Sequence, residues 1–481
     1  MQLKVFNNLL REKVDFHKKP GEKVQFYSCG PTTYDFLHVG NARAQVVADL
    51  MNRVLRTLGY DVTFVRNFTD VDDKIIARAG ELGMDPIVFA DKWVKECLQD
   101  MQALGMKPAD ATPKVSETMP EIVKMIEDII ANGYAYVVQG EVYFDVSKKN
   151  DFGDYGKLSK KDLESLQHGI RVEVDNKKRN SSDFVLWKPT KPNEGASWDS
   201  PWGKGRPGWH IECSAMAKKH LGETIDLHHG GVDLMFPHHE NEIAQSEAAN
   251  KKLFCHCWAH NEFLNFGSEK MSKSLGNVVT IRKFVETYGG QVLRHLLLSV
   301  HYRAKMEWSD EVIERAMGEV QRIHEFAQEV KSFKADGKPE TLTNIIQEMK
   351  DELSNDFNSA GAFASFFTFI REVRTLASKN QNSFSRENLV LISETLAFVN
   401  EAMGLIHENP QHILEELQKV KRKLGGGTLS DEAIKALIEE RKTAKQAKNF
   451  KRSDEIRDLL KAQKIVLKDN PDGTTSYSFE S

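Results

Sequence analysis

The pattern of apolar and polar positions near the start of the chain predicts a strand, a helix and a second strand. Residues 24–29 form a short apolar and aromatic run that stops at Gly30-Pro31, which predicts a buried strand ending in a sharp turn. Residues 41–58 carry apolar side chains at helical spacing, and Gly59 follows as a helix stop. Residues 62–68 predict the second strand. A strand–helix–strand unit of about 45 residues indicates a parallel sheet and an α/β fold.

The same pattern divides the rest of the chain. Residues 85–135 are predicted to be largely helical, and residues 140–206, rich in Gly, Pro, Trp and Lys, to form an insertion with short strands. The α/β pattern resumes at Trp209, and residues 305–408 predict one helix after another. Residues 423–428 predict a glycine-rich linker, which is followed by a basic helical pair and a short β-like tail.

These segments predict a Rossmann-type parallel-sheet domain with an inserted connective domain, an α-helical bundle and a small basic C-terminal module. The expected boundaries are 1–115 and 207–304 for the two halves of the parallel-sheet domain, 116–206 for the connective insertion, 305–420 for the bundle and 428–481 for the C-terminal module.

Composition and charge narrow the class of protein. Of the 481 residues, 40% are hydrophobic and 28% are charged, which excludes a disordered chain, a collagen-like repeat and a disulfide-stapled secreted module. The net charge of −4 hides a gradient, because residues 419–468 hold 15 basic and 7 acidic residues. That local balance of +8 leaves −12 on the remainder. An acidic body with a basic tail is an asymmetry that the function has to explain.

Cysteine usage points to a reducing compartment. The five cysteines are an odd number, thinly spread, and do not form a disulfide framework. No signal-peptide core and no apolar run of about 18 residues is present, so we expect a cytoplasmic protein without a membrane span. Cys97, Cys255 and Cys257 are interpreted as core residues. The alternative for Cys255-His256-Cys257, with the nearby His260, is a second metal site.

The turn after the first predicted strand is a candidate phosphate-binding site. It feeds a helix N-terminus, where unsatisfied N–H groups and the helix dipole favour anions. Gly40 allows close approach of a ligand to the backbone, and His38 and Asn41 can hydrogen-bond phosphate or ribose. The alternative is an ordinary turn with helix-capping residues.

A second candidate for phosphate chemistry is the polar loop at residues 270–277. It places Lys270, Lys273, Ser272 and Ser274 close together. Two flexible ammonium groups suit a phosphoryl group on which negative charge develops during transfer. The alternative is a solvated surface loop.

A third set of residues has the chemistry of a metal site. His238 and Glu242 are four residues apart on a helix predicted to begin near Pro237, which puts both side chains on one face. Cys29 and Cys213 can add two thiolates, which completes a plausible tetrahedral zinc set. The alternative is a polar helix start beside inert core cysteines.

Residues 38–41 and 270–274 together resemble the HIGH and KMSKS signatures of class I aminoacyl-tRNA synthetases, in the same order and at a similar separation. The KMSKS match is complete, whereas the HIGH match has Val39 for Ile and Asn41 for the last His. Residues 67–74, 209–214 and 236–242 are similar to segments particular to the cysteinyl-tRNA synthetase family. The resemblance covers nearly the whole chain.

The resemblance implies a cysteine–tRNA ligase reaction. L-Cysteine would be activated with ATP to cysteinyl-adenylate, releasing diphosphate, and then transferred to the 3′-terminal ribose of tRNA-Cys. It implies one Zn²⁺ per chain, which selects the thiol, and Mg²⁺ with ATP. The partners would be tRNA-Cys, ATP and L-cysteine, with no membrane, and a monomer is expected.

The resemblance also assigns the site residues. The implied zinc ligands are Cys29, Cys213, His238 and Glu242. The implied catalytic residues are His38, Asn41, Lys270 and Lys273. ATP would be bound by Gly40, His38, Asp233, Lys270, Lys273 and Ser274, and the amino acid by Gly30, Thr69 and Trp209.

Besides Val39, the chain departs from the family pattern at three positions. Asn41 replaces a His, His229 stands where the family usually has Gly, and Tyr477 stands where family members often have Trp. One rival hypothesis is a related enzyme that passes cysteine to a small amine, as in mycothiol biosynthesis. Another is a non-catalytic paralogue that binds tRNA. Both fit less well, because a small acceptor needs no basic tail and a silent paralogue needs no intact loop at 270–274. The basic tail is then a candidate surface for the RNA backbone at the anticodon end, against the alternative of a solvated helix face.

Overall fold

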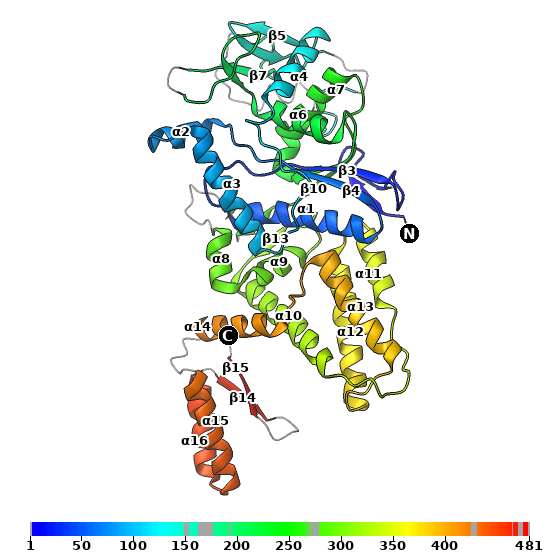
Figure 1. Cartoon of the computed structure of the whole chain (residues 1–481), viewed down its shortest axis with the longest axis vertical. Helices are drawn as coiled ribbons and strands as arrows, with labels where there is room; N and C mark the ends of the chain where they lie inside the picture. Colours follow the sequence, from blue (N-terminus) through cyan, green and yellow to red (C-terminus); the bar gives the residue numbers. More distant parts are fainter. Residues whose placement is uncertain are drawn as a thin grey trace.

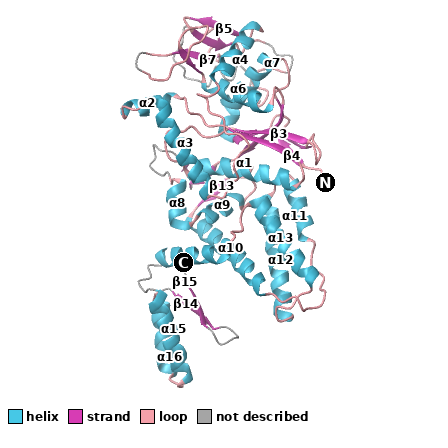
Figure 2. Ribbon diagram, viewed as in Figure 1, coloured by secondary structure: helices cyan, strands magenta, loops and turns pink. Residues whose placement is uncertain are grey.

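The structure is a computed structural model of the chain (Figure 1). It describes residues 2–148, 153–161, 177–191, 194–266, 269–270, 279–424, 431–463, 465–469 and 475–479. The molecule is elongated, with an antiparallel sheet at one end, a parallel sheet near the middle and helices dominating the rest (Figure 2). No helix within the described ranges is both long and apolar enough to cross a lipid bilayer.

A four-stranded parallel sheet forms the centre of the fold. Its elements and covering helices are β3 (Lys23–Ser28), β4 (Asp61–Arg66), β9 (Ile225–Gly231), β10 (Cys255–Asn261), α1 (Val39–Thr57), α6 (Trp209–Leu221) and α7 (Glu240–Asn250). The strand order is β10-β9-β3-β4. Successive side chains of a strand point to opposite faces of the sheet. In β3, Phe26 accordingly packs with α1, whereas Tyr27 packs with α6 and α7. The predicted Rossmann-type α/β fold is confirmed.

The connective insertion is a separate antiparallel sheet beside α4 (Met119–Ala131). Its strands are β5 (Ala135–Val138), β6 (Glu141–Phe144), β7 (Phe184–Pro189) and β8 (Gly205–Pro207), paired in that order. The region predicted to be largely helical contains α3 (Pro86–Ala103) and α4, but residues 104–118 between them are not helical. Their backbone instead pairs with the parallel sheet, as in the hydrogen bond from Arg66 N to Ala111 O.

A third, small sheet lies next to α1. It consists of β12 (Glu269–Lys270), β11 (Leu264–Phe266) and β13 (Met306–Trp308), in that order. The chain between β12 and β13 includes α8 (Ile281–Tyr288) and α9 (Gly290–Leu298). At the N-terminus, β1 (Lys4–Asn7) and β2 (Glu12–Asp15) form an antiparallel pair.

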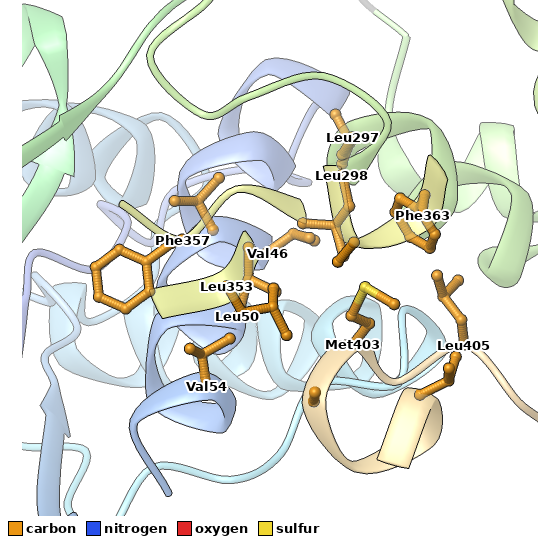
Figure 3. Packing of buried hydrophobic residues seen from close by; sticks show 14 of the residues in the cluster. Val46, Leu50, Val54, Leu297, Leu298, Leu353, Phe357, Phe363, Met403 and Leu405 are labelled. Carbon is orange, nitrogen blue, oxygen red and sulfur yellow. The ribbon is translucent and has the colours of Figure 1, made fainter. Parts of the chain in front are cut away.

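The helical bundle shares a hydrophobic core with α1. Its helices are α10 (Asp310–Glu329), α11 (Ile345–Ser354), α12 (Ser359–Lys379), α13 (Arg386–Met403) and α14 (Pro410–Leu424). In Figure 3, Val46, Leu50 and Val54 of α1 face apolar side chains of α9, of α11 to α13 and of the loops that follow them. The helix that begins at the candidate phosphate turn is therefore held from the bundle side as well.

The C-terminal module has a small core of its own. It contains α15 (Asp431–Gln446), α16 (Phe450–Ala462), β14 (Ile465–Asp469) and β15 (Thr475–Phe479), a helical pair followed by an antiparallel strand pair, as predicted. Ile434, Ile456, Leu460 and Ile465 form its core. The predicted linker begins inside α14, and residues 425–430 lie outside the described residues.

Candidate active site

A cavity of about 440 Å³ opens at the carboxyl ends of the parallel strands. Its walls come from the turn after β3, the start of α1, the end of β9 and the residues that follow β10. A crevice at this edge of an open α/β sheet is the usual ligand site of such folds. The predicted residues Cys29, Gly30, His38, Gly40 and Asn41 all line it.

Gly30 occupies a position where a side chain does not fit. A Cβ atom on Gly30 would lie 1.6 Å from the carbonyl oxygen of Asn67, so the turn requires glycine there. The Gly30 N–H donates to Asn67 Oδ1 at 2.9 Å, which ties the turn to the segment after β4. The turn is thereby held close to the sheet edge.

His38 and Asn41 fix the N-terminus of α1. The helix begins at Val39, two residues earlier than predicted, because His38 is its N-cap. The backbone N–H of Asn41 donates to His38 Nδ1 at 3.2 Å, and the backbone N–H of His38 donates to Asn41 Oδ1 at 3.3 Å. This reciprocal capping arrangement satisfies two backbone donors of the helix start. In the neutral imidazole it also leaves the proton on Nε2, which makes that nitrogen a donor.

The structure describes only the residues that flank the second predicted phosphate element. Lys270 is the last residue of β12, and Lys273 and Ser274 lie outside the described residues. On the far side of the loop, Val39 N donates to Val279 O at 3.0 Å and Ile281 N donates to Leu37 O at 2.8 Å. The chain that leaves residues 271–278 is therefore hydrogen-bonded to the His38 turn.

The four predicted metal ligands come together. One donor atom each from Cys29, Cys213, His238 and Glu242 lies within 4.8 Å of the others, and all four residues are buried. The two sulfurs are 3.8 Å apart, Cys29 Sγ is 3.4 Å from Glu242 Oε1, and His238 Nε2 is 3.0 Å from the same oxygen. These donors come from the end of β3, from α6, from the turn before α7 and from α7 itself.

The turn before α7 shapes the metal cluster. The regular helix begins at Glu240, later than the predicted start near Pro237, because residues 235–239 form a wider turn with Phe236 in an extended conformation. His238 and Glu242 nevertheless share one face, as the i, i+4 spacing predicts.

Three further histidines surround the cluster and were not predicted to take part. His228 Nε2 lies 2.8 Å from Glu242 Oε2, and His210 Nδ1 lies 2.9 Å from His238 Nδ1. His239 Nε2 lies 3.4 Å from Cys29 Sγ, so Cys29, His228, His239 and Glu242 form a second close set of donors. The i, i+3 spacing of His239 and Glu242 was a signal in the sequence that could have identified His239. His228 and His210 come from β9 and α6, which no local spacing could place here.

The electrostatics divide the four donors: burial raises the pKa of Cys29 well above its usual value, whereas Cys213 and Glu242 have lowered pKa values. A hydrogen bond from the Cys29 thiol lowers the pKa of Cys213 to about 6, helped by His238 and opposed by burial. Burial opposes the charge on Glu242, but His228 and His238 outweigh it and hold its pKa at about 2. Burial likewise opposes the charge on His238, but Glu242 raises its pKa to about 10. Cys213 and Glu242 are thus in the form that binds a cation, whereas Cys29 and His238 would each release a proton on binding one.

The predicted amino-acid pocket is only partly exposed. Trp209 is 40% exposed at the wall of the cavity, and its ring lies 4.3 Å from the His238 ring, centroid to centroid. Asp233 also lines the cavity. Thr69 is buried, and its carbonyl accepts hydrogen bonds from the backbone and side chain of Thr33.

The unusual His229 is buried in the central sheet. Its Nδ1 lies 3.2 Å from Ser28 Oγ, and burial lowers its pKa to about 3, so the ring is neutral. Cys255 and Cys257 are buried on β10 and belong to the two different core layers, and Cys97 is buried on α3. All three belong to buried hydrophobic clusters, which confirms their interpretation as core residues.

Comparison with known proteins places the chain in a family. Residues 15–318 match the family described as tRNA synthetases class I (C) catalytic domain. Cysteine–tRNA ligase from Geobacter sulfurreducens is 44% identical, with 99% of each chain covered, and the enzyme from Shouchella clausii is 45% identical, with 98% covered.

Solved structures share the fold at low sequence identity. Methionyl-tRNA synthetase of Mycobacterium tuberculosis, in complex with methionyl-adenylate, has a TM-score of 0.61 at 15% identity, covering 82% of this chain and 93% of that one. The leucyl enzyme in a ternary complex with tRNA, from Agrobacterium radiobacter K84, has a TM-score of 0.57 at 12% identity, covering 84% and 86%.

The parallel sheet, the capped turn at its carboxyl edge and the matching catalytic-domain family define a class I aminoacyl-tRNA synthetase. This makes the protein an ATP-dependent ligase that aminoacylates tRNA. At 44% identity over nearly its full length, the chain belongs to the cysteine–tRNA ligase family, whose acceptor is tRNA-Cys.

Proposed function

We propose that this chain activates L-cysteine with ATP to cysteinyl-adenylate, releases diphosphate and transfers the cysteinyl group to the 3′-terminal ribose of tRNA-Cys. The observation that carries the proposal is the position of Cys29. Its sulfur belongs to the four-donor cluster, and the next residue, Gly30, opens the turn that leads to His38 in the same cavity. A thiol-selective site and a phosphate site are thereby adjacent.

The donor set fits zinc. Two cysteine sulfurs, one imidazole and one carboxylate match the ligands and the number that Zn²⁺ prefers. Cys29, Cys213, His238 and Glu242 would hold the ion, and His228 and His210 would orient Glu242 and His238. When bound, zinc supplies a soft Lewis acid that prefers the thiolate of cysteine to the hydroxyl of serine.

The capped start of α1 supports a role in ATP binding. His38 would donate from Nε2 to a phosphate oxygen, and Asn41 would keep the imidazole in that tautomer. A Cβ at Gly40 would lie 3.0 Å from His38 Nδ1, so glycine leaves the ring room to keep this orientation. Asp233 at the cavity wall is a candidate ligand of ATP. Lys270 and Lys273, with Mg²⁺, would neutralise the β- and γ-phosphates, and Ser274 would donate a hydrogen bond to ATP.

The first step is an in-line displacement at the α-phosphate. A carboxylate oxygen of cysteine forms a bond to the α-phosphorus, and the bond from that phosphorus to the bridging oxygen of diphosphate breaks. Gly30, Thr69 and Trp209 would position the amino acid, and the lysines would compensate the charge on the departing diphosphate. Positioning and charge compensation carry the rate. In the second step, a ribose hydroxyl attacks the carbonyl carbon and AMP leaves.

The C-terminal module supports a contact with tRNA. Lys448 is exposed between α15 and α16, and Lys451 is exposed in the first turn of α16. Arg441 and Lys445 instead pair with Asp469, and Arg452 pairs with Glu440. The lining of a cleft of about 580 Å³ between α14 and the module includes Lys419, Arg422, Lys435 and Tyr477, together with the carboxylates of Glu415 and Glu439. Lysine and arginine side chains are the residue types that bind the RNA backbone, and aromatic rings stack on its bases. We place the anticodon end of the tRNA here.

We further infer that the protein works as a monomer in the cytoplasm, where its five buried free cysteines stay reduced. The central experiment is transfer of radiolabelled cysteine to total tRNA with and without ATP. ATP-dependent, acid-precipitable label is expected. Label that goes to a small amine, or no transfer to tRNA, would contradict the proposal.

A further inference from the structure

Arg43 is a fully buried cation in the second turn of α1. Its guanidinium donates hydrogen bonds to the backbone carbonyls of Phe263, Tyr302 and Ala304. Burial lowers the pKa of Arg43 to about 10, which leaves it charged at neutral pH. The planar fork of a guanidinium reaches several carbonyls at once, which a lysine cannot do.

The three carbonyls lie where two strands of the small sheet begin. Phe263 O also accepts from Met306 N at 3.2 Å, and Tyr302 O accepts from Glu262 N at 2.9 Å. β11 pairs with β13 on one side and with β12 on the other, where Asn265 is opposite Lys270. Arg43 therefore fixes the origin of the sheet that carries Lys270.

The same helix start carries the other phosphate residues. Arg43 follows His38 by five residues, a rise of about 7.5 Å along an α-helix. The chain after the loop is tied to the same turn through Val279 and Ile281. Both described flanks of residues 271–278 are thus attached to the start of α1, one through the Arg43 side chain and one through the backbone.

We propose that Arg43 is a positioning residue for cysteine activation. It holds the sheet of β11, β12 and β13 in register with α1, so that Lys270 and His38 meet the same ATP molecule. This inference rests on the proposed function, in which Lys270 compensates charge on the phosphates. Arg43 itself touches backbone and not substrate, and it acts through Lys270.

Arg294 offers a matched control. It is also fully buried and also donates to backbone carbonyls, those of Met403 and Leu104, and it pairs with Asp49. These partners connect α9 to α1, to the end of α3 and to the end of α13 in the bundle, and not to the small sheet. A purely structural effect of losing a buried guanidinium should therefore be similar in Arg43→Met and Arg294→Met.

The test uses the full-length, metal-loaded protein and cysteine-dependent ATP–diphosphate exchange. Arg43→Met is expected to lower kcat about 100-fold, the cost of misplacing a group by roughly 1 Å, with the KM for cysteine within about twofold. Arg43→Lys should fall in between, and it carries the test if Arg43→Met does not fold. Arg294→Met should reduce the thermal midpoint but keep kcat within about threefold.

A double-mutant cycle with Lys270→Ala tests whether Arg43 acts through that lysine. The double variant should be no slower than Lys270→Ala alone, because the positioned group is already absent. Losses that multiply, or equal losses of kcat in Arg43→Met and Arg294→Met, would overturn the inference. Wild-type protein without cysteine-dependent exchange would instead contradict the proposed function.

Discussion

The Nδ1 atom of His38 accepts a hydrogen bond from the backbone N–H of Asn41 at 3.2 Å, while Asn41 Oδ1 accepts one from the backbone N–H of His38 at 3.3 Å. The departure from the HIGH pattern at Asn41 thus sits in a capping interaction. Its short amide closes the first turn of α1 and holds the His38 ring. The side chain combines a structural role with the proposed binding of ATP.

Replacing Asn41 by Ala should lower the free energy of unfolding by about 1 kcal/mol, as lost helix caps do, and should also raise the KM for ATP. Asn41→Asp keeps an acceptor for the His38 N–H and adds a negative charge that favours the helix N-terminus. Its stability should match the wild type, whereas its KM for ATP should rise through repulsion of phosphate. Urea unfolding and ATP–diphosphate exchange measure the two effects. Unchanged stability in Asn41→Ala would contradict the capping role.

The proposed zinc site predicts a selective loss of metal. Cys213→Ser should remove the bound zinc. The pKa of Cys213 is lowered to about 6, so the wild type offers a thiolate, whereas the serine hydroxyl of the variant does not ionise. The KM for cysteine should rise with it. Cys257→Ser is the matched control, since Cys257 is equally buried but belongs to the other core layer. Mass spectrometry of the metal content should give nearly no zinc in Cys213→Ser and one ion per chain in Cys257→Ser. Full occupancy in Cys213→Ser would exclude it as a ligand.

The proposed role of Lys273 predicts that its loss slows the activation of cysteine without affecting the binding of zinc. Lys273→Ala should slow cysteine-dependent ATP–diphosphate exchange by at least about 100-fold while the zinc content stays that of the wild type. Lys283→Ala, on the exposed face of α8, should leave both unchanged. Normal exchange in Lys273→Ala would refute the assignment.

Local patterns predicted the fold well because its core elements obey them. The run at 24–29 and the helical stripe after Asn41 correspond to β3 and α1 within two residues. Spacing also put His238 and Glu242 on one face. Long-range contacts were beyond local spacing. Donor chemistry offered Cys29 and Cys213 as partners for that pair and the family resemblance implied the same four ligands, and the structure brings all four together.

The parts that sequence reasoning missed depend on residues far apart in the chain. His228 reaches Glu242 from β9, and Arg43 meets carbonyls more than two hundred residues further on. A buried arginine also contradicts the expectation that charged positions on an amphipathic helix face solvent. The burial of Arg43 is decided by the small sheet and the loop before it, which the apolar pattern did not predict.

The junction between α1 and the bundle predicts a pH dependence of stability. Burial opposes the charge on Asp49, but Arg294 and Arg53 outweigh it, and the pKa of Asp49 lies below its usual value. A carboxyl whose pKa is lower in the folded than in the unfolded chain stabilises the fold at pH values above the unfolded pKa of about 3.9. This contribution is lost as the pH falls through the pKa of the folded state. Asp49→Asn should therefore be less stable at neutral pH and should show a shallower loss of stability from pH 6 to pH 3. Urea unfolding across that range measures it, and parallel curves would contradict the assignment.

The separate core of the C-terminal module predicts that it can be removed without affecting cysteine activation. Its buried side chains, Ile434, Ile456, Leu460 and Ile465, share no cluster with α1 or the parallel sheet. A chain ending at Gly427 should keep ATP–diphosphate exchange within about twofold of the full chain. Charging of tRNA-Cys should fall at least about tenfold, because phosphate contacts dominate such affinities.

The double substitution Lys448→Ala and Lys451→Ala in the full-length chain tests the same surface without removing the module. These exposed lysines should weaken tRNA binding and reduce the slope of log affinity against log salt by about one per lost phosphate contact. Cysteine activation should be unaffected, because both residues lie far along the chain from the cavity at α1. If the truncated chain charges tRNA as efficiently as the full chain, the basic tail is a solvated helix face and the tRNA must be held by the bundle and the parallel-sheet domain.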